Sequence, residues 1–289
     1  MSRTRLTPIL LSCSLALSLT FFPSKARSQD SFTTIDVPGA TETDANDINK
    51  AGSVVGFYVD SAAADHGFLL RNGHFSFINF PGATSTLAYG INDLNQIVGW
   101  YVDASGVTHG YLFSSGKFTS IDVPGSGGTT ECWSISNSGE IVGTYTDSSG
   151  VVFHGFTDVN GNFTTVDVGT TLSQVTGINR QGVLVGIFFD NSGNQHGFQD
   201  VNGKFTTITY PGATITSAAR INTSGEIVGL YGSSSTGPFS GYFKVRGVYT
   251  TIMFPGSTET RVRGLNDAGI VVGRYTDVAG VIHGFEGHP

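Results

Sequence analysis

The sequence predicts an all-β fold, a six-bladed β-propeller of four-stranded antiparallel blades, and three observations carry that prediction. Glycine makes up 40 of the 289 residues, about twice its usual share, while only 13% of residues are charged, about half the usual share. No segment has the sustained 3.6-residue apolar period of an amphipathic helix. A unit of 43 or 44 residues recurs six times, marked by a Val-Gly pair whose glycines are Gly56, Gly99, Gly143, Gly186, Gly229 and Gly273. A period of that length is typical of propellers and other repeat proteins.

Each unit contains four short segments rich in β-branched and aromatic residues, which predict strands. In the second unit they cover residues 88–91, 96–102, 109–113 and 117–123. The connections between them are hairpin-sized and contain Gly, Asn or Asp, the residues that tight turns require. Four strands joined in this way form an antiparallel meander, and meanders repeated around an axis form a propeller.

The two ends of the chain predict how the ring closes. Residues 32–37 resemble a fourth strand without the three that should precede it, and the last unit ends after its third strand. We therefore expect residues 32–37 to complete the last blade, beside residues 262–265, 270–276 and 281–286. Such pairing would satisfy a strand edge that is otherwise open to aggregation.

Residues 1–28 have the pattern of a secretory signal peptide. Arg3 and Arg5 precede an apolar run, and small residues lie near Ser28, where we expect cleavage. The mature chain, residues 29–289, is then a single propeller domain in the periplasm or outside the cell.

Two other outcomes for the N-terminus stay open. The apolar run of about 17 residues is short for a permanent membrane anchor, which usually needs about 20. Processing as a lipoprotein at Cys13 would leave the apolar residues 15–22 in the mature chain. We expect no membrane span after the signal is removed.

The charge balance excludes some partners. Removing residues 1–28 takes away four of the 15 basic residues and none of the 22 acidic ones, which changes the formal charge from −7 to −11. Nucleic acid and anionic membranes both require basic surfaces, so we expect neither as a partner. Cys132 is the only cysteine left, which excludes an internal disulfide and fits a small core residue.

The unit, written FTTIDVPGAT followed by GINDxGxIVGxYxDxxGxxHGFL, resembles the bacterial probable-extracellular-repeat family known as HAF repeats. That family is named after a His-Ala-Phe tripeptide, where this chain has His66, Gly67 and Phe68 or their equivalents. The resemblance covers roughly residues 31–287. It implies an exported propeller and supplies no reaction or ligand.

Histidines and aspartates recur at fixed places in the unit. A ring of repeats would hold the histidines far apart, so we expect them to have structural roles, bonded to a nearby Asp or carbonyl, rather than to bind metal. The aspartates follow the second strand, where a carboxylate accepts backbone N–H groups of a turn. A calcium site remains a weak alternative, because each turn offers one carboxylate. These residues are His66, His109, His154, His196, His283, Asp60, Asp103, Asp147, Asp190 and Asp277.

Positions that differ between units are better candidates for binding. In the first strand of each unit one position varies widely (Asn46, Tyr89, Trp133, Thr176, Ala219, Arg263), and so does its neighbour (Asp47, Gly90, Ser134, Gly177, Arg220, Gly264). Strand alternation predicts that the two sets face opposite ways and that one lines the central channel. Because aromatics and arginine dominate binding energies, the candidate ligand-binding residues are Tyr89, Trp133, Arg220 and Arg263.

The function predicted is an exported monomeric scaffold that binds a protein, a glycan or a cell-envelope component through one propeller face. The sequence has no nucleophile elbow, zinc-protease motif or phosphate loop, so we identify no catalytic residue and expect no cofactor. Two alternatives stay open. One is a lyase or hydrolase with its site at the channel mouth, and the other is a lectin with similar glycan sites in every blade.

Overall fold

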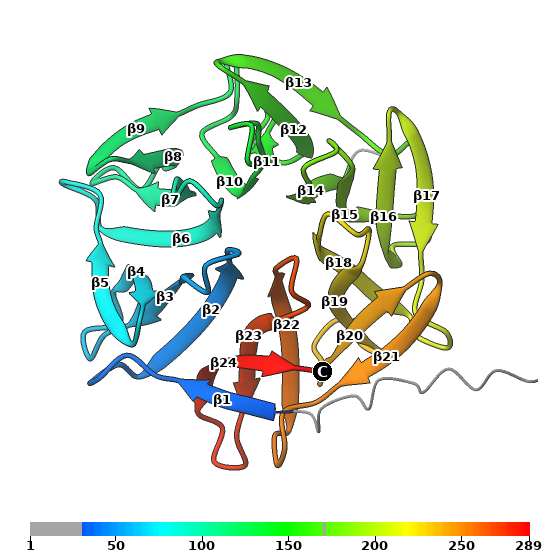
Figure 1. Ribbon diagram of the computed structural model, residues 1–289. Helices are drawn as coiled ribbons and strands as arrows, with labels where there is room; N and C mark the ends of the chain where they lie inside the picture. Colours follow the sequence, from blue (N-terminus) through cyan, green and yellow to red (C-terminus); the bar gives the residue numbers. More distant parts are fainter. Residues whose placement is uncertain (1–30, 170–171) are drawn as a thin grey trace, which may run out of the picture.

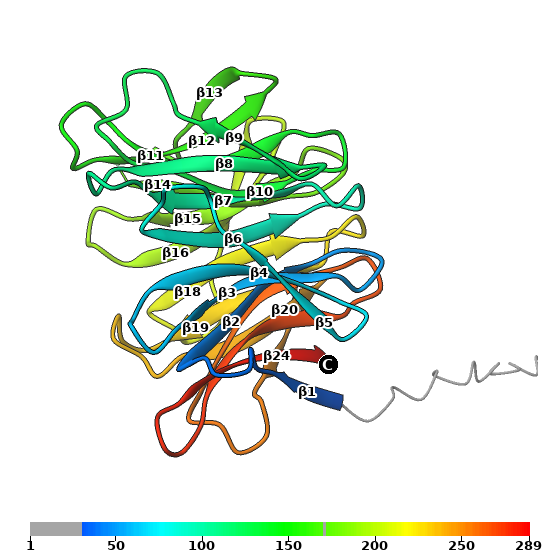
Figure 2. The ribbon, with the colours of Figure 1, turned by 90° about the vertical axis from the view of Figure 1, so that its left-hand side faces the viewer.

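A computed structural model describes residues 31–169 and 172–289, and the predicted signal segment, residues 1–28, lies outside them. The described residues form 24 strands, arranged as sheets around a central axis (Figures 1 and 2). Within those residues we find no helix long and apolar enough to cross a membrane. The all-β propeller predicted from the repeats is therefore present.

Four of the sheets are antiparallel meanders of four strands, as the repeats predict. Their strands are β6 (Ser85–Ile91), β7 (Ile97–Val102), β8 (Thr108–Ser114) and β9 (Lys117–Ile121); β10 (Thr130–Ile135), β11 (Ile141–Thr146), β12 (Phe153–Val159) and β13 (Asn162–Val166); β14 (Ser173–Ile178), β15 (Leu184–Phe189), β16 (Gln195–Val201) and β17 (Lys204–Ile208); β18 (Ile215–Ile221), β19 (Ile227–Gly232), β20 (Ser240–Val245) and β21 (Val248–Ile252).

The remaining strands form one eight-stranded sheet, so the prediction of six blades is wrong in its count. A single parallel residue pair, Glu42 with Ile282, joins two antiparallel meanders into this sheet. The difference arises where the ring closes, because the start of β2 runs beside the start of β24. The order is β22-β23-β24-β2-β3-β4-β5 with β1 beside β24, from β1 (Ser31–Ile35), β2 (Glu42–Ile48), β3 (Val54–Val59), β4 (Asp65–Arg71), β5 (His74–Ile78), β22 (Glu259–Leu265), β23 (Val271–Thr276) and β24 (Ile282–His288).

The N-terminal strand closes the ring against the C-terminal strand. β1 pairs antiparallel with β24, from Ser31 opposite His288 to Ile35 opposite Gly284. This is the pairing that the lone fourth-type strand predicts. It holds the two ends of the described chain together by strand hydrogen bonds.

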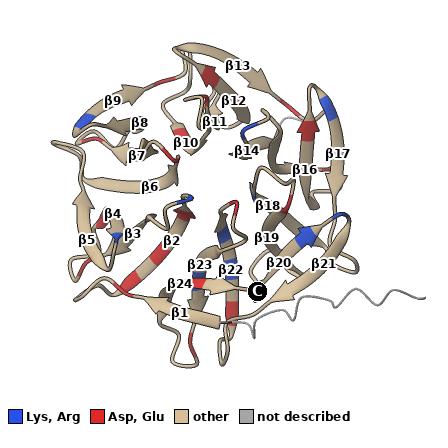
Figure 3. Cartoon of the chain, viewed as in Figure 1, with Lys and Arg blue, Asp and Glu red and all other residues tan. Residues whose placement is uncertain are grey.

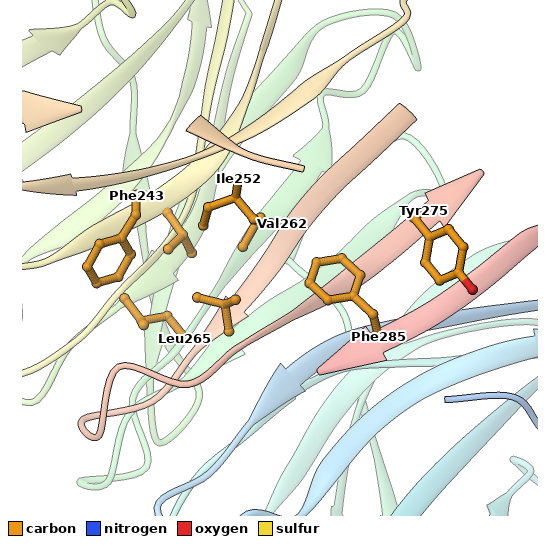
Figure 4. Close-up of a cluster of buried hydrophobic side chains, with 8 residues drawn as sticks. Phe243, Ile252, Val262, Leu265, Tyr275 and Phe285 are labelled. Atoms are coloured by element: carbon orange, nitrogen blue, oxygen red, sulfur yellow. The ribbon is translucent and has the colours of Figure 1, made fainter. Parts of the chain in front are cut away.

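The core lies between neighbouring sheets and is built from the repeated motifs. The aromatic residue of each His-Gly-aromatic motif, and of its equivalent Ser240-Gly241-Tyr242 in the fifth repeat, is fully buried. Complete burial of such a ring stabilises the fold by about 1.5–3 kcal/mol. Figure 4 shows one cluster, in which Phe243 and Ile252 of one sheet pack with Val262 and Phe285 of the next. The six buried rings are Phe68, Tyr111, Phe156, Phe198, Tyr242 and Phe285.

The Val-Gly glycines are required by close packing within each sheet. A Cβ atom at Gly56 would lie 1.9 Å from the carbonyl oxygen of Asp44 and 2.8 Å from the ring of Phe68. Equivalent contacts occur at the other five Val-Gly pairs. The recurrence of this glycine therefore reflects the packing of the second strand between the first strand and the core aromatic.

Candidate functional site

The axis is surrounded by six inner strands, β2, β6, β10, β14, β18 and β22, each of which contacts the next in a closed ring. We name the two ends of the axis by their connections. The loop end is where the inner strands begin. The connections between sheets and the turns that follow the second strands lie there side by side, and the hydrogen bond from Thr41 N to Val59 O links them in the first repeat. The turn end is where the inner strands finish, in turns such as Asn49–Gly52.

Every inner strand has a β-bulge at the first of the two variable positions. The register shifts between Ala45 and Asp47, for example, so that Asn46 has no direct partner on β3. The simple alternation expected from the sequence is therefore interrupted, because a bulge changes the direction of the residues beside it. The bulged residues reach toward the next inner strand: Asn46 Nδ2 donates to Ala88 O at 2.9 Å, and Thr176 Oγ1 donates to Ala218 O at 2.6 Å.

Arg220, from the second variable position, lies across the axis. Its guanidinium donates to the carbonyl oxygens of Tyr89 at 2.5 Å and Trp133 at 2.7 Å, and also to that of Thr176. Its Nε lies 3.4 Å from Asp47 Oδ1, and only about 5% of the residue is exposed. One side chain thus connects five of the six inner strands and closes the channel.

Asp47 is the buried counter-ion of Arg220. Its carboxylate accepts the backbone N–H groups of Ile48 at 3.0 Å and Ile91 at 3.1 Å. Burial raises the pKa of Asp47, while Arg220 and the two N–H groups oppose that shift. At this level the inner strands pack backbone to backbone, since a Cβ at Gly264 would lie 2.7 Å from Asp47 Cα.

Below Arg220, at the turn end, the inner strands are linked by a ring of asparagines. Asn49 Nδ2 donates to Asn92 O at 3.3 Å, and four more links of this kind continue around the axis. The sixth is missing from the described residues, because Ser136 takes the place of asparagine there. The ring surrounds a cavity of about 80 Å³ whose floor includes Asp47 and Arg220. The other donors and their acceptors are Asn92 to Ser136, Asn179 to Asn222, Asn222 to Asn266, and Asn266 to Asn49.

Above Arg220, at the loop end, the side chains around the axis differ in every repeat. We call this region the mouth and define it by the cross-strand pairs just before each bulge, together with the bulged residues Tyr89, Trp133 and Arg263. The two residues of such a pair share one face of a sheet and interact directly. The pairs are Asp44 with Phe57, Leu87 with Trp100, Glu131 with Thr144, Gln174 with Ile187, Ser217 with Leu230, and Arg261 with Arg274.

Aromatic rings gather on one side of the mouth. Tyr89 stacks on Trp100, with ring centroids 3.9 Å apart, and meets Trp133 edge to face at 4.7 Å. The two tryptophans are 4.9 Å apart, and both are partly exposed. The sequence contains only two tryptophans, so both lie in this cluster. Partly exposed aromatic rings at the end of a channel are typical of binding surfaces.

Glu131 lies beside these rings in an apolar setting. Burial raises the pKa of its carboxyl to about 7, and the indole N–H of Trp133 opposes that shift. The indole interacts with the carboxyl, although Trp133 Nε1 is buried and has no hydrogen bond of good geometry. The hydroxyl of Thr144, opposite Glu131 on β11, is also buried without a hydrogen-bond partner. Buried polar groups are normally paired, so two unsatisfied groups beside the Glu131 carboxyl mark a potential ligand site.

Charged residues lie next to the aromatic side of the mouth, on β22, β23 and β2 (Figure 3), since β2 is the neighbour of β6 in the ring. Arg263 Nε lies 3.1 Å from Asp44 Oδ1, and Arg274 Nη1 lies 3.3 Å from Asp44 Oδ2. Arg274 also pairs with Glu42 at 3.0 Å. Each positive charge in this group has a carboxylate beside it, as does that of Arg261, which pairs with Glu259.

The four candidate binding residues from the sequence therefore separate into two groups. Tyr89 and Trp133 lie together in the mouth, and Arg263 is close to Tyr89. Burial raises the pKa of the Tyr89 hydroxyl, and the charge of Arg263 opposes that shift. Arg220 lies below them with its donors bonded to backbone carbonyls. These contacts do not support a ligand-binding role for Arg220.

The repeated histidines lie at the outer rim of the loop end, each close to the turn aspartate or the end of the fourth strand. His66 Nε2 lies 3.1 Å from Asp60 Oδ2, and His109 Nδ1 lies 2.7 Å from Asp122 Oδ1. Backbone N–H groups, chiefly that of Val107, lower the pKa of Asp103. The remaining histidines have a partner at Nδ1: Asp167 for His154, Thr209 for His196, and Asp36 for His283. These contacts agree with the structural roles expected, which stay a prediction.

The described residues include potential metal ligands, the His, Asp and Glu side chains, and a single thiol. Across residues 31–169 and 172–289, no group of three or more His, Cys, Asp or Glu side chains could hold a metal ion. Cys132 is completely buried, and its burial raises the pKa of the thiol. A Cβ at Gly110 of the neighbouring sheet would lie 2.6 Å from its sulfur, so Cys132 fills a small space between sheets.

The sequence-based search missed several residues of the mouth. Glu131 and Trp100 are the most prominent, and Asp44 and Arg274 complete the charged side. A signal for them was present, because the position of Trp100 on the second strand also varies from repeat to repeat. Glu131 and Asp44 lie on inner strands, two residues before the bulged position, and their equivalents vary in the same way.

Comparison with known proteins gives a similar fold at low sequence identity. No protein-family model matches the sequence, and no curated protein matches it. A mutant Aleuria aurantia lectin in complex with Fucα1-6GlcNAc is 11% identical, with a TM-score of 0.53 over 85% of this chain and 91% of that chain. TolB from Acinetobacter baumannii is 12% identical, with a TM-score of 0.55 over 82% of this chain and 64% of that chain.

A third similar structure is regucalcin from Agrobacterium tumefaciens, described as a calcium-binding protein. It is 11% identical, with a TM-score of 0.50 over 88% of this chain and 94% of that chain. Likeness at such identities shows a shared fold. The fold and the axial site together define this chain as a β-propeller protein, and its function must be argued from the site itself.

Proposed function

We propose that the protein is an exported binding protein that holds one ligand at the mouth, the loop end of its central axis. The observation that carries the proposal is the concentration there of partly exposed aromatic rings and incompletely satisfied polar groups. Trp133 supplies a ring and an unpaired indole N–H, and Glu131 supplies a carboxyl without an ion-pair partner. The fold is similar to that of a lectin in complex with Fucα1-6GlcNAc and to that of regucalcin, described as a calcium-binding protein, which makes a binding role for this fold reasonable.

The two alternatives have less support. An enzyme at the mouth would use a pair of perturbed acids. Two acids at the loop end have a raised pKa, but they are on different inner strands: Glu42 on β2 pairs with Arg274, and Glu131 lies on β10. A lectin with equivalent sites in every blade would use the repeated histidines and aspartates, but those side chains bond one another. The mouth offers one asymmetric site instead of several equivalent ones.

The two tryptophans make the proposal directly testable. Because both lie in the mouth, intrinsic tryptophan fluorescence reports on this site alone. Titrating the mature protein with glycans and cell-envelope fragments should change the emission for a true ligand, and Trp133→Ala should abolish binding measured by calorimetry. Phe77→Ala is the control, since this aromatic residue is exposed on an outer strand. A ligand that binds Trp133→Ala as tightly as the natural protein would show that the mouth is not the binding site.

A further inference from the structure

We propose that the mouth selects an organic cation, an ammonium group on a small or flexible carrier, which Glu131 binds as a counter-ion beside the rings of Trp133, Trp100 and Tyr89. This inference rests on the proposed function and names the class of ligand. It follows from the charges, the unpaired atoms and the aromatic rings of the mouth, considered in turn.

The charges of the mouth balance except at Glu131. Arg263 and Arg274 share Asp44, and Arg274 also contacts Glu42. Arg261 pairs with Glu259 on its own strand. In the part of the chain that the structure describes, no Lys, Arg or His forms an ion pair with Glu131. When this carboxyl is ionised, the site carries one uncompensated negative charge, which a cationic ligand would neutralise.

The polar atoms around Glu131 are arranged to assist an ammonium group. Thr144 Oγ1 has no hydrogen-bond partner and lies opposite Glu131 on the neighbouring strand, so it can accept a second N–H of the ligand. The indole N–H of Trp133 favours the ionised form of the carboxyl, because it opposes the upward pKa shift that burial causes. An ammonium group has three donors and no acceptor, so it can donate to the Glu131 carboxylate and to the Thr144 hydroxyl at the same time.

The aromatic rings favour the same ligand. An ammonium near the face of a tryptophan or tyrosine is attracted by the ring quadrupole, and more strongly where water is excluded. Trp100 and Trp133 are both partly exposed, so ring surface remains available beside the Tyr89 contacts. An anionic ligand would instead meet the charge of Glu131 while every nearby arginine is already paired.

The pH dependence gives a distinctive signature. Glu131 binds the cation only when ionised, and its pKa is about 7 in the free protein. The titratable groups that interact with it are Tyr89 from β6 and Cys132 from its own strand. Burial raises the pKa of both, so they stay neutral near pH 7. The apparent affinity should therefore rise by about tenfold from pH 6 to pH 8.

The test is a tryptophan fluorescence titration of the mature protein with n-butylammonium chloride, at constant ionic strength, with n-butanol as the uncharged control. We expect the ammonium salt to change the emission, n-butanol to have little effect, and Glu131→Gln to weaken ammonium binding by about tenfold or more. Glu140→Gln, which removes a carboxylate at the turn end, should bind like the natural protein. Circular dichroism and melting of both variants show that they are folded.

Four results would overturn the proposal, and they separate it from the proposed function. Equal responses to n-butylammonium and n-butanol would mean that the mouth does not select a cation, and undiminished ammonium binding by Glu131→Gln would mean that Glu131 is not its counter-ion. A response to a neutral saccharide such as methyl α-glucoside, with none to the ammonium salt, would reject the cation and keep the mouth as a binding site. Ligand binding that leaves tryptophan emission unchanged and survives Trp133→Ala would reject both.

Discussion

The two ends of the central axis are built from the same six inner strands but differ in regularity. At the turn end nearly every repeat supplies the same asparagine, and its donors and acceptors are satisfied by the neighbouring strand. At the loop end the equivalent cross-strand pairs are all different, and buried polar atoms such as Trp133 Nε1 lack partners. Arg220 separates the two regions.

This difference separates two kinds of position in a repeat protein, those that hold the ring together and those that are free to bind a ligand. Where a residue recurs, its contacts are with the neighbouring repeat and it stabilises the ring. Where a residue varies, its contacts are not needed for closure, so the position is free to take a role in binding. Each prediction below tests whether a residue belongs to the regular or the variable region.

The largest expected effect is at Arg220. Arg220→Met removes the bonds to three inner strands and leaves Asp47 buried without its counter-ion, which should lower the free energy of unfolding by about 3–5 kcal/mol. Chemical denaturation measures this loss. Arg180→Met, which replaces an exposed arginine at the turn end, should change stability little. The double variant Asp47→Asn with Arg220→Met should recover part of the loss, and a failure to recover any would mean that the charge pair is not its cause.

Glu131→Gln should have a large effect of the opposite sign. The pKa of Glu131 is raised from 4.5 to about 7, so the folded protein holds a proton that the unfolded chain releases, and stability falls as pH rises between these values. At pH 8 the substitution should stabilise the fold by about 3 kcal/mol, because each pKa unit corresponds to about 1.4 kcal/mol. At pH 4 the two proteins should be equally stable.

Melting curves of Glu131→Gln and the natural protein from pH 4 to pH 8 check this. A stability difference that is constant over the range would contradict a raised pKa. A gain at pH 8 together with a loss of ligand binding would place Glu131 in the variable, functional region.

His109→Ala should destabilise the protein moderately. The substitution removes a contact of 2.7 Å to Asp122 and the stacking on Tyr101, which together contribute about 1 kcal/mol at this partly exposed site. Thermal melting measures the change, and metal analysis of the same samples should give no difference. His74→Ala, at an exposed position on β5, is the control. Loss of a bound metal ion from His109→Ala would contradict the structural role.

Ser136→Asn should have the smallest effect and a stabilising one. An asparagine here can donate to the carbonyl of Asn179 and supply the missing sixth link of the ring. The gain should be about 0.5 kcal/mol, because the bond between Ser136 and Ser138 is lost in exchange. A destabilised variant would mean that the turn at Ser136 cannot adopt the geometry of its equivalents.

The tight turns of the fold were predictable from the sequence because each depends on local conformation. Asn72 and Gly73 both have positive φ, as a two-residue hairpin turn requires, and Asn and Gly between strand segments are the residue types that predict such turns. The buried Phe68 and the close contact at Gly56 were likewise marked by their recurrence. The count of separate sheets was not predictable, since it depends on one parallel pair, Glu42 with Ile282, formed where the ring closes.

The site was predictable only in part. Tyr89 and Trp133 were identified because they differ from their equivalents, but a bulge in every inner strand made the expected alternation unreliable. The same criterion selected Arg220, whose hydrogen-bond partners lie on strands that are far away in the sequence. One of them is the carbonyl of Tyr89, 131 residues away. A list of variable positions does not distinguish a side chain that closes the channel from one that faces a ligand.

By itself the sequence determined the repeat, the meander of four strands, the turns that join them and the pairing of the N-terminal strand with the end of the chain. These features follow from the local preferences of residues and from the period at which they recur. Only the tertiary structure decided which variable residues meet. Glu131 gains its raised pKa from burial among rings of other strands, and Arg220 gains its role from carbonyls across the axis. Both depend on how the repeats are arranged around the axis, which no single repeat specifies.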